Sequence, residues 1–407
     1  MTKKIRVLHL IKSLGRGGAE KLIPETALVH DQSRFEFYCL YFFHQENNTV
    51  EELTHAGIQV QLIPSGNLGL FFQIPKVREF IRHHSIDIVH AHLPWAGILS
   101  RLVGRKLNIP LVYTEHNTWD RYNKISYWGN RLTFKNQDIA IAVSNEVALS
   151  MQLNTMLDPY RRGGRLQIKV IQNGVNTDEF KRLEPQVNSL DVPFPPTFKA
   201  PEPVKSLKSQ LGIPEGSKVI GKVAVFRSQK RLWIWVELAL KILEKCPDTH
   251  FLLVGDGDWR DRILEQIQLS GKSKHFHWVG VKKEVIPYLS IMDIYLSSSE
   301  FEGLPIAMLE AMSCEVPVVA TRAGGIGEMV QDRIQGFLSE IDEYENLVGH
   351  CVCLLGDQML HDQMAKAARE RVVEQFSMKR MVQELEAVYD WAVSRATSHF
   401  SSPNRLE

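Results

Sequence analysis

The sequence predicts an α/β protein made of two doubly wound parallel-sheet domains. Short runs rich in β-branched and aromatic residues recur along the 407-residue chain, with helical patterns between them. Several runs are continuously apolar rather than alternating, as expected for strands that helices cover on both faces. The series of runs occurs twice, and a chain of this length suits two domains of about 100 to 200 residues each.

The first series of runs defines an N-terminal domain over residues 1–180. It contains seven candidate strands, at residues 5–11, 35–43, 59–63, 86–91, 111–114, 139–144 and 168–172. A last helix, at about residues 378–395, carries apolar residues at a spacing that makes a packing stripe.

The second series defines a C-terminal domain over residues 211–377, with candidate strands at residues 219–226, 250–254, 276–279, 294–297 and 317–320. Residues 181–210 hold six prolines between positions 185 and 203, which exclude a continuous helix or a central strand there. We interpret this segment as a linker or surface insertion. Two such domains facing each other form a crevice at the carboxyl ends of their strands, where open α/β sheets bind ligands.

The composition is that of an ordinary soluble protein, with 44% hydrophobic and 23% charged residues. Five scattered cysteines favour buried free thiols in a reducing compartment. The N-terminus breaks its apolar run too often for a signal peptide, and no run approaches the ~18 apolar residues of a spanning helix. We therefore expect a cytoplasmic protein whose membrane contact, if any, is peripheral.

Positive charge is concentrated in residues 76–169, where 14 Lys or Arg stand against 7 Asp or Glu. Two interpretations stay open. The basic side chains either solvate helix faces, or attract an anionic partner such as the inner face of a membrane at about 1 kcal/mol per residue. Nothing in the pattern indicates a nucleic-acid partner.

The first candidate strand ends in a glycine-rich turn, SLGRGGAEKL, in which Gly15, Gly17 and Gly18 precede a helix. Glycines let the backbone approach a ligand, and the free N–H groups of a helix start favour anions. The motif lacks the full GxGxxG pattern, so a tight strand-to-helix turn remains the alternative.

Histidines follow two neighbouring candidate strands: His90 and His92 in IVHAHLPWAG, and His116 after Glu115 in YTEHNTW. A single histidine at a strand end is more often structural than catalytic. Strand ends on one rim favour a functional role for His116. Metal ligation is less expected, because the partners are not spaced for a closed site.

In the second half, GKVAVFRSQKRLW runs from a strand into Arg227, Lys230 and Arg231. Cations at such a strand end can hold a diphosphate and stabilise it as it leaves. A solvated helix start is the alternative, although cations there oppose the helix dipole. Gly255 and Gly257 follow the next strand, where a tight turn or close packing against a base and ribose would each explain them.

The segment SEFEGLPIAMLEAM places two glutamates around an apolar helix. Pro305 suits the first helical position, so Gly303 and Leu304 lie at a helix N-terminus that can bind phosphate. Glu302 is then on the loop, and Glu310 lies about one and a half turns inside the helix, leaning back toward its start. Both carboxylates can accept hydrogen bonds from the hydroxyls of one sugar-containing ligand.

The order and spacing of these segments resemble the retaining glycosyltransferases of family 4, with their E-x7-E motif at Glu302 and Glu310. The likeness covers nearly the whole chain through GGAE (17–20), HAH (90–92), TEHN (114–117), AVSN (142–145), NGVNTDEF (173–180), Lys230, VGDG (254–257), EGLPIAMLEAM (302–312), GGIGE (324–328) and GF (336–337). The resemblance implies the GT-B fold, in which two Rossmann-like domains face a central cleft. It also implies that the last helix returns to the N-terminal domain.

The resemblance implies a nucleotide-sugar donor held mainly by the C-terminal domain, a glycan or lipid-linked acceptor held by the N-terminal one, and no metal or other cofactor. Glu310 is then expected to bind the donor ribose and Glu302 the sugar hydroxyls. The backbone around Gly303, Leu304 and Pro305 would lie near the sugar or phosphate.

By the same resemblance, Lys230 neutralises the departing diphosphate, which Gly17 and Gly18 approach from the opposite domain. His116 matches a family histidine that contacts the transferred sugar. The family's Gly-Arg pair is replaced by Ala224 and Val225, and we expect Arg227 to act as the second phosphate cation.

The expected reaction is transfer of a hexose or N-acetylhexosamine from a nucleoside-diphosphate sugar, with UDP favoured, and with retention at the anomeric carbon. Retention through a covalent intermediate needs a carboxylate on the far face of the sugar. No good candidate stands near His116, so a front-face route is favoured. The alternatives are a nucleotide-sugar epimerase or a catalytically inactive sugar-binding subunit.

Overall fold

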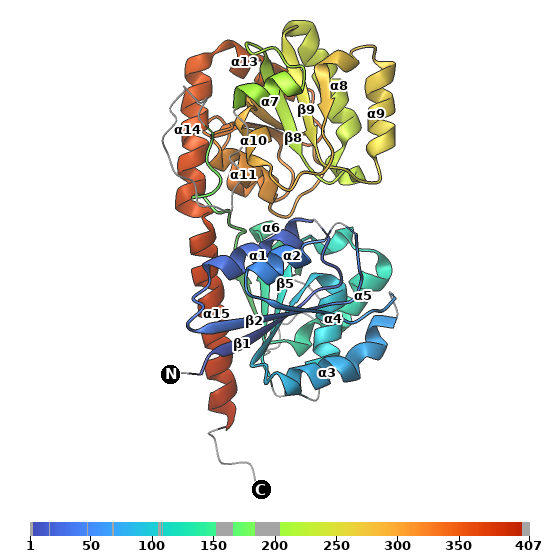
Figure 1. Cartoon of the computed structure of the whole chain (residues 1–407), viewed down its shortest axis with the longest axis vertical. Helices are drawn as coiled ribbons and strands as arrows, with labels where there is room; N and C mark the ends of the chain where they lie inside the picture. Colours follow the sequence, from blue (N-terminus) through green and yellow to red (C-terminus); the bar gives the residue numbers. More distant parts are fainter. Residues whose placement is uncertain are drawn as a thin grey trace. The chain divides into compact units, whose positions relative to one another are not determined.

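The computed structural model describes residues 3–15, 17–46, 48–66, 69–104, 107, 109–151, 166–183 and 204–400. Most of the predicted Pro-rich segment, residues 184–203, lies outside them. So do Arg105, Lys106, Arg161, Arg162 and Arg165 of the basic region. The chain divides into two compact units, Met1–Gly174 with Met378–Glu407, and Val175–Ser377 (Figure 1).

The first unit contains a seven-stranded parallel sheet in the order β3-β2-β1-β4-β5-β6-β7 within the described residues. Its strands are β1 (Ile5–Leu10), β2 (Phe35–Tyr41), β3 (Gln59–Leu62), β4 (Ile88–His92), β5 (Leu111–Glu115), β6 (Ile139–Ala142) and β7 (Gln167–Val170). Every residue of β4, β5 and β6 is buried, as the continuously apolar runs predicted for strands with two covered faces.

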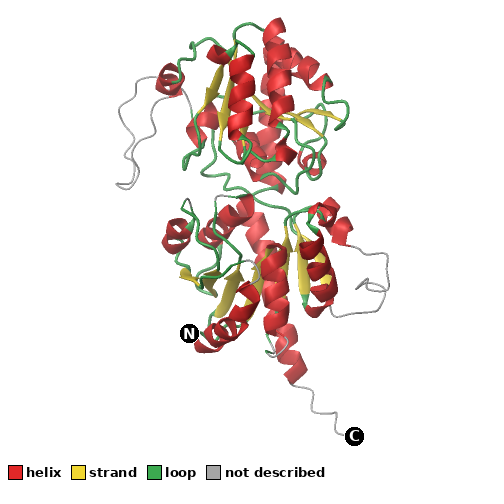
Figure 2. Ribbon diagram, turned by 90° about the vertical axis from the view of Figure 1, so that its right-hand side faces the viewer, coloured by secondary structure: helices red, strands yellow, loops and turns green. Residues whose placement is uncertain are grey.

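Helices cover both faces of this sheet (Figure 2). They are α1 (Gly18–Val29), α2 (Val50–His55), α3 (Ile74–His83), α4 (Leu93–Gly104), α5 (Lys124–Thr133), α6 (Asn145–Met151) and α15 (Met378–Phe400). The last of these comes from the far end of the chain and packs against α1 and β4. Its buried stripe is formed by Met381, Val382, Leu385, Val388, Tyr389 and Ala392.

The second unit contains a parallel sheet in the order β10-β9-β8-β11-β12-β13, again within the described residues. Its strands are β8 (Lys218–Val223), β9 (Thr249–Val254), β10 (Phe276–Trp278), β11 (Ile294–Ser297), β12 (Val318–Thr321) and β13 (Gly336–Ser339). The strand order reverses between β8 and β11, as it does between β1 and β4 in the first unit. Both units are therefore doubly wound α/β domains, as predicted.

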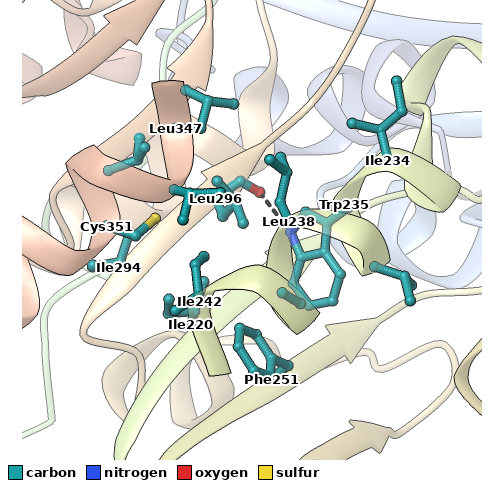
Figure 3. Packing of buried hydrophobic residues seen from close by; sticks show 14 of the residues in the cluster. Ile220, Ile234, Trp235, Leu238, Ile242, Phe251, Ile294, Leu296, Leu347 and Cys351 are labelled. Atoms are coloured by element: carbon teal, nitrogen blue, oxygen red, sulfur yellow. Dashed lines mark hydrogen bonds between the residues drawn. The ribbon is translucent and has the colours of Figure 1, made fainter. Parts of the chain in front are cut away.

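The helices of the second unit are α7 (Val204–Gln210), α8 (Leu232–Lys245), α9 (Arg260–Leu269), α10 (Ile286–Ser290), α11 (Ile306–Ser313), α12 (Ile326–Met329), α13 (Asn346–Gly356) and α14 (Gln358–Gln375). The core between α8 and the sheet is centred on Trp235, which is fully buried and donates from Nε1 to the Leu296 carbonyl at 3.1 Å (Figure 3). Ile242 and Phe251 lie in the same core.

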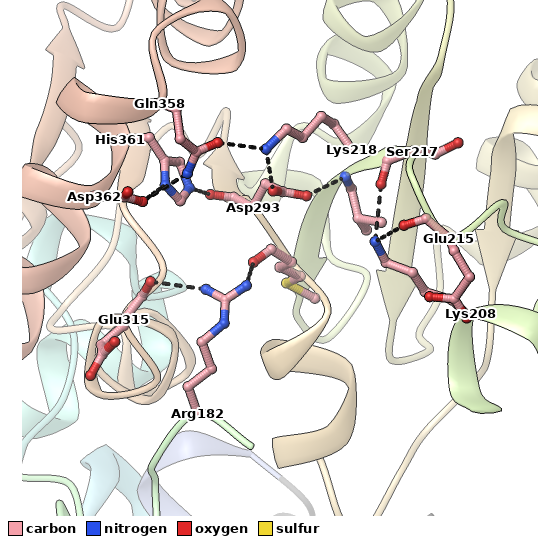
Figure 4. A network of polar contacts seen from close by, with 12 residues as sticks. Arg182, Lys208, Glu215, Ser217, Lys218, Asp293, Glu315, Gln358, His361 and Asp362 are labelled. Carbon is pink, nitrogen blue, oxygen red and sulfur yellow. Dashed lines mark hydrogen bonds and ion pairs between the residues drawn. The ribbon is translucent and has the colours of Figure 1, made fainter. Parts of the chain in front are cut away.

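A polar network ties the amino ends of β8 and β11 together (Figure 4). Asp293, just before β11, accepts from the Lys218 ammonium at 3.1 Å and from the Val219 N–H at 2.8 Å. Its carbonyl accepts from His361 of α14 at 2.8 Å. This network belongs to the edge of the sheet opposite the strand ends at which ligands bind, so it is structural.

Two details differ from the sequence expectations. Strand β13 was not predicted, because it begins with a glycine, at φ 153°, and glycine is unfavourable in a strand. Cys353 is exposed and Cys246 partly exposed, whereas Cys39, Cys314 and Cys351 are buried free thiols as expected. No helix among the described residues is both long and apolar enough to cross a membrane.

Candidate functional site

In the second unit, the loops that follow β8 and β11 bring two predicted site residues together. Lys230, at the end of a short 3-10 helix (Ser228–Lys230), donates from Nζ to both Glu302 carboxylate oxygens at 2.6 Å. The two side chains are 18% and 8% exposed. This is a largely desolvated, bidentate ion pair at the reversal point of the strand order, where ligands bind in such sheets.

Hydrogen bonds to backbone carbonyls fix the two loops to each other. The Glu300 N–H donates to the Gln229 carbonyl at 2.8 Å, and the Ser298 hydroxyl donates to the Arg231 carbonyl at 3.0 Å. In return, the Arg231 guanidinium donates to the Ser298 carbonyl at 2.7 Å. Arg231 therefore holds the loops together, and its own backbone is left-handed at φ 45°.

Glu302 is ionised in spite of its burial. Desolvation alone would raise the pKa of this carboxyl group. The charges of Lys230 and Lys222, with hydrogen bonds from Lys230 and Ser299, outweigh desolvation and lower the pKa below its usual value. The site therefore keeps a carboxylate acceptor, already oriented, at neutral pH.

Helix α11 begins beside this pair. Gly303 and Leu304 are buried in the loop that enters it, and Pro305 immediately precedes its first residue, Ile306. Glu310 lies in the fifth position of the helix and is only 3% exposed. Seven of the eight residues of this helix are buried, so Glu310 is not a solvated end charge. That the two glutamates face one ligand stays a prediction.

The glycines after β9 have a structural explanation. A Cβ at Gly255 would lie 1.9 Å from the Ala224 carbonyl oxygen, and one at Gly257 would lie 2.7 Å from that of Phe226. Gly255 also has φ +129°, which side chains disfavour. Close packing of the two strand-end loops, β8 against β9, thus requires both glycines.

Arg227, the predicted second phosphate cation, lies on the loop that follows β8. Its side chain is exposed and makes no hydrogen bond or ion pair with the described part of the chain. The buried cation of this region is one that sequence reasoning missed: Lys222, which is 2% exposed and donates from Nζ to the Ser297 hydroxyl at 2.6 Å. Its signal in the sequence was a lysine inside an otherwise apolar strand.

In the first unit, the glycine turn leads directly into α1. Gly17 is the N-cap residue, with no side-chain hydrogen bond, and Gly18 is the first helical residue. A Cβ at Gly17 would lie 2.3 Å from the Glu20 carboxylate. The backbone is therefore approachable at this turn, and a side chain at position 17 would displace only the flexible end of Glu20, so local packing does not require the glycine.

Three buried histidines meet where the strand order of the first sheet reverses. His9 of β1 and His92 of β4 are joined by a hydrogen bond of 3.0 Å between Nδ1 and Nε2. His90 bonds the Tyr389 hydroxyl of α15 at 2.7 Å and the Thr114 hydroxyl of β5 at 2.7 Å. Together with His116 they line a small cavity whose remaining walls are mainly apolar but include Thr26, Thr114 and Tyr389.

Burial keeps these rings neutral. Desolvation lowers the pKa of His9 to about 3 and that of His116 to about 4, and it also lowers the pKa values of His90 and His92 well below the usual range. Nε2 of His116 is buried without a hydrogen-bond partner in the described chain. A neutral ring nitrogen of this kind can contact a sugar hydroxyl.

Nitrogen atoms of His9, His90 and His92 lie within 4.8 Å of one another, which is compatible with a metal ligand set. Both nitrogens of His90, however, already have hydroxyl partners. We retain the expectation of a metal-free cluster as a prediction.

Glu115, next to His116, is part of the core. It is fully buried and accepts from the Tyr113 hydroxyl at 2.6 Å, from Trp119 Nε1 at 2.9 Å and from the Tyr122 hydroxyl. The buried Arg101 stacks on the Tyr113 ring at 4.6 Å. These contacts saturate the carboxylate and hold the His116 loop in place.

Comparison with known proteins agrees with this architecture. Residues 16–179 match the family described as Glycosyltransferase Family 4, and residues 204–371 match the one described as Glycosyl transferases group 1. The chain is 27% identical over 327 residues to the N-acetyl-alpha-D-glucosaminyl L-malate synthase of Bacillus anthracis, covering 77% of each chain.

A second relative is the UDP-Gal:alpha-D-GlcNAc-diphosphoundecaprenol alpha-1,3-galactosyltransferase of Escherichia coli, 26% identical over 322 residues, with 76% of this chain and 77% of the relative covered. Among solved structures, Anabaena HepE in complex with UDP and glucose superposes with a TM-score of 0.78 and 21% identity, over 95% of this chain and all of the other. That likeness shows the fold.

Proposed function

This chain is a family 4 glycosyltransferase of the GT-B fold, and we propose that it transfers a hexose or N-acetylhexosamine from a UDP-sugar to a lipid-linked or polysaccharide acceptor with retention of configuration. The observation that carries the proposal is the buried Lys230–Glu302 pair beside the start of α11. It combines a cation for a leaving diphosphate with a carboxylate for sugar hydroxyls.

The roles proposed for the site residues of the second unit follow from the charge that develops on the diphosphate. As the glycosidic bond to the diphosphate breaks, negative charge grows on the phosphate oxygens. An ammonium such as that of Lys230 stabilises this charge more in the transition state than in the ground state, which accelerates the reaction. The N–H groups around Gly303 and Leu304 would act on the same phosphate or on the sugar, and Glu310 would accept from the ribose hydroxyls.

The environment of Glu115 in the first unit favours retention by a front-face route over a covalent intermediate. Glu115 is the carboxylate closest in sequence to His116, and its oxygens are occupied by three side-chain donors in the core. It is therefore a poor nucleophile for a covalent glycosyl intermediate. In the proposed route the departing phosphate oxygen takes the acceptor proton, while neutral His116 contacts the transferred sugar.

UDP is the favoured carrier because the name of the E. coli relative includes UDP-Gal and HepE was solved with UDP. The diphosphoundecaprenol-linked acceptor in the relative's name supports a lipid-linked acceptor here. We further propose that no metal is needed, since ammonium groups supply the positive charge that a divalent cation would otherwise provide. The matches give no support to an epimerase.

Incubation with UDP-glucose, UDP-galactose or UDP-N-acetylglucosamine, with and without a polyprenyl-diphosphate-linked sugar, tests this function. We expect UDP release that depends on acceptor, is unchanged by a chelator, and yields an α-linked product by the anomeric proton coupling. Thermal protection by UDP should exceed that by GDP or ADP. Nucleotide binding without transfer to any acceptor would instead favour an inactive sugar-binding subunit.

A further inference from the structure

Lys222 is a buried cation in the middle of an apolar sheet. It belongs to β8, is 2% exposed, and donates to the Ser297 hydroxyl of the neighbouring strand β11 at 2.6 Å. Its ammonium also lies 5.2 Å from the centre of the Tyr295 ring. Burying an ammonium is strongly unfavourable unless it is compensated, so a lysine here needs a reason other than solubility.

Two serine hydroxyls connect this ammonium to the candidate site. Ser297 Oγ lies 3.1 Å from Ser299 Oγ, and the Ser299 hydroxyl donates to Glu302 Oε1 at 2.7 Å. A protonated amine has only donors, so it fixes the direction of the chain: Ser297 accepts from Lys222 and donates to Ser299, which donates to Glu302. Glu302 thus accepts hydrogen bonds directly from Lys230, and it is linked to Lys222 through the hydroxyls of Ser297 and Ser299.

The two lysines have different freedom. Lys230 reaches Glu302 from a loop and is 18% exposed, whereas Lys222 is held within the sheet. If Lys230 turns toward a departing diphosphate, Glu302 loses its direct partner, and an uncompensated buried carboxylate would tend to take up a proton or move.

We propose that Lys222 is the second cation of the donor site, a positioning residue that acts through Ser297 and Ser299 to keep Glu302 ionised and oriented while Lys230 serves the diphosphate. This inference rests on the proposed function and deepens it. The family's arginine position is occupied by Val225 in this chain. Lys222 would then be a buried second cation of the site, in addition to the exposed Arg227.

Titration distinguishes this role from simple packing. Burial lowers the pKa of Lys222 to about 7. The charge of Lys230 lowers this pKa further, whereas the charge of Glu302 raises it. The third titratable neighbour, Tyr295, has its pKa raised by burial and so stays neutral in this range. Above neutral pH the Lys222 amine loses its proton, and its positive charge should then no longer keep Glu302 ionised and oriented.

The test is Lys222→Met, which keeps an unbranched side chain only one atom shorter and removes the charge. Lys218→Met is the matched control, because Lys218 lies on the same strand but pairs with Asp293 at its amino end. We expect kcat to fall about 10- to 100-fold in Lys222→Met, as for loss of precise positioning, with donor KM little changed. The control variant should keep a kcat close to that of the wild type.

The pH profile gives a second readout. The wild-type kcat/KM should decline on the basic side from about pH 7, and this limb should be absent in Lys222→Met. Ser299→Ala, which interrupts the hydroxyl chain while keeping the amine, should lower kcat in the same direction and serves if the lysine variant does not fold. Wild-type kcat and an unchanged basic limb in these variants would overturn the inference.

A measurement without turnover separates this inference from the proposed function. In protein labelled with ¹³C at lysine Cε, the Lys222 titration should move to lower pH in Glu302→Gln, because the neighbouring negative charge is gone. An unmoved titration would refute the coupling even in an active enzyme. If the wild type transfers no sugar but the Lys222 titration still shifts in Glu302→Gln, the proposed glycosyl transfer is refuted and the coupling of Lys222 to Glu302 is not.

Discussion

The ammonium of Lys230 and the carboxylate of Glu302 form a bidentate pair at 2.6 Å from two loops that follow neighbouring strands. Replacing Lys230 with Met removes the cation that the leaving diphosphate would need. We expect transfer to fall by about 10²- to 10³-fold, the usual effect of deleting one group that stabilises transition-state charge. The decrease should appear in kcat measured at saturating donor.

Lys241→Met is the control for Lys230→Met. Lys241 also makes a 2.6 Å ion pair, with Glu345, but both partners are about half exposed or more. Exposed pairs contribute little, so this variant should keep wild-type turnover. Equal turnover in Lys230→Met and Lys241→Met would remove Lys230 from the mechanism.

Sequence reasoning located this pair because both residues follow strands, and parallel strands end on one edge of a sheet. It did not find Lys222, since a lysine within a strand is usually taken as solvent-facing. In a sheet covered on both faces that inference fails, because every inward position is buried. The contact of Lys222 with Ser297 was equally invisible, because it depends on the register of β8 and β11.

In the first unit, His116 was identified from its strand end, but its buried companions were only partly found. His9 stands alone in an apolar strand, and only the pairing of β1 with β4 brings it to His90 and His92. Pairing order is a long-range property that a local pattern does not specify. The role of Tyr389 likewise depends on a helix some 300 residues away along the chain.

Glu310 should govern donor affinity more than rate. It is buried in α11, and Glu310→Gln keeps its shape while removing the charge that would accept from ribose hydroxyls. We expect UDP to bind about 10-fold more weakly, or about 1.4 kcal/mol, as measured by titration calorimetry. Glu315→Gln, an exposed residue just beyond the same helix, is the control. Unchanged UDP affinity in Glu310→Gln would contradict the ribose assignment.

The first unit should lose stability as the pH falls from about 6.5 to about 4. Burial holds the folded pKa of His116 at about 4 and of His9 at about 3, below the unfolded value of 6.5. The unfolded chain therefore binds more protons in this window, which favours unfolding. Above pH 6.5 the rings are neutral in both states, and the effect vanishes.

Thermal unfolding followed between pH 4 and 8 measures this acid sensitivity. His116→Asn should make the decline shallower, because one group no longer takes up a proton on unfolding. His55→Gln changes an exposed histidine of α2 and should leave the profile as in the wild type. A wild-type profile in His116→Asn would show that this ring takes up protons equally in the folded and unfolded states.

Tyr389→Phe should destabilise the first unit without a matching loss of kcat. The variant removes the 2.7 Å hydrogen bond to His90 and leaves a buried ring nitrogen unsatisfied, a loss of about 1–3 kcal/mol in the free energy of unfolding. Denaturant unfolding measures this difference. Tyr38→Phe is the control, because the Tyr38 hydroxyl donates to Glu36, whose side chain is 32% exposed. This variant should lose less stability, and an equal loss in the two variants would argue against the buried contact.

The return of α15 to the first unit has a consequence for synthesis on the ribosome. Residues Val175–Ser377 are contiguous, so the second unit can complete its core as soon as it emerges. The first unit emerges earlier, yet Met381, Leu385 and Tyr389 of its core are translated last. Domains usually fold in order from the N-terminus. Here the unit that is made first is the one that finishes folding last.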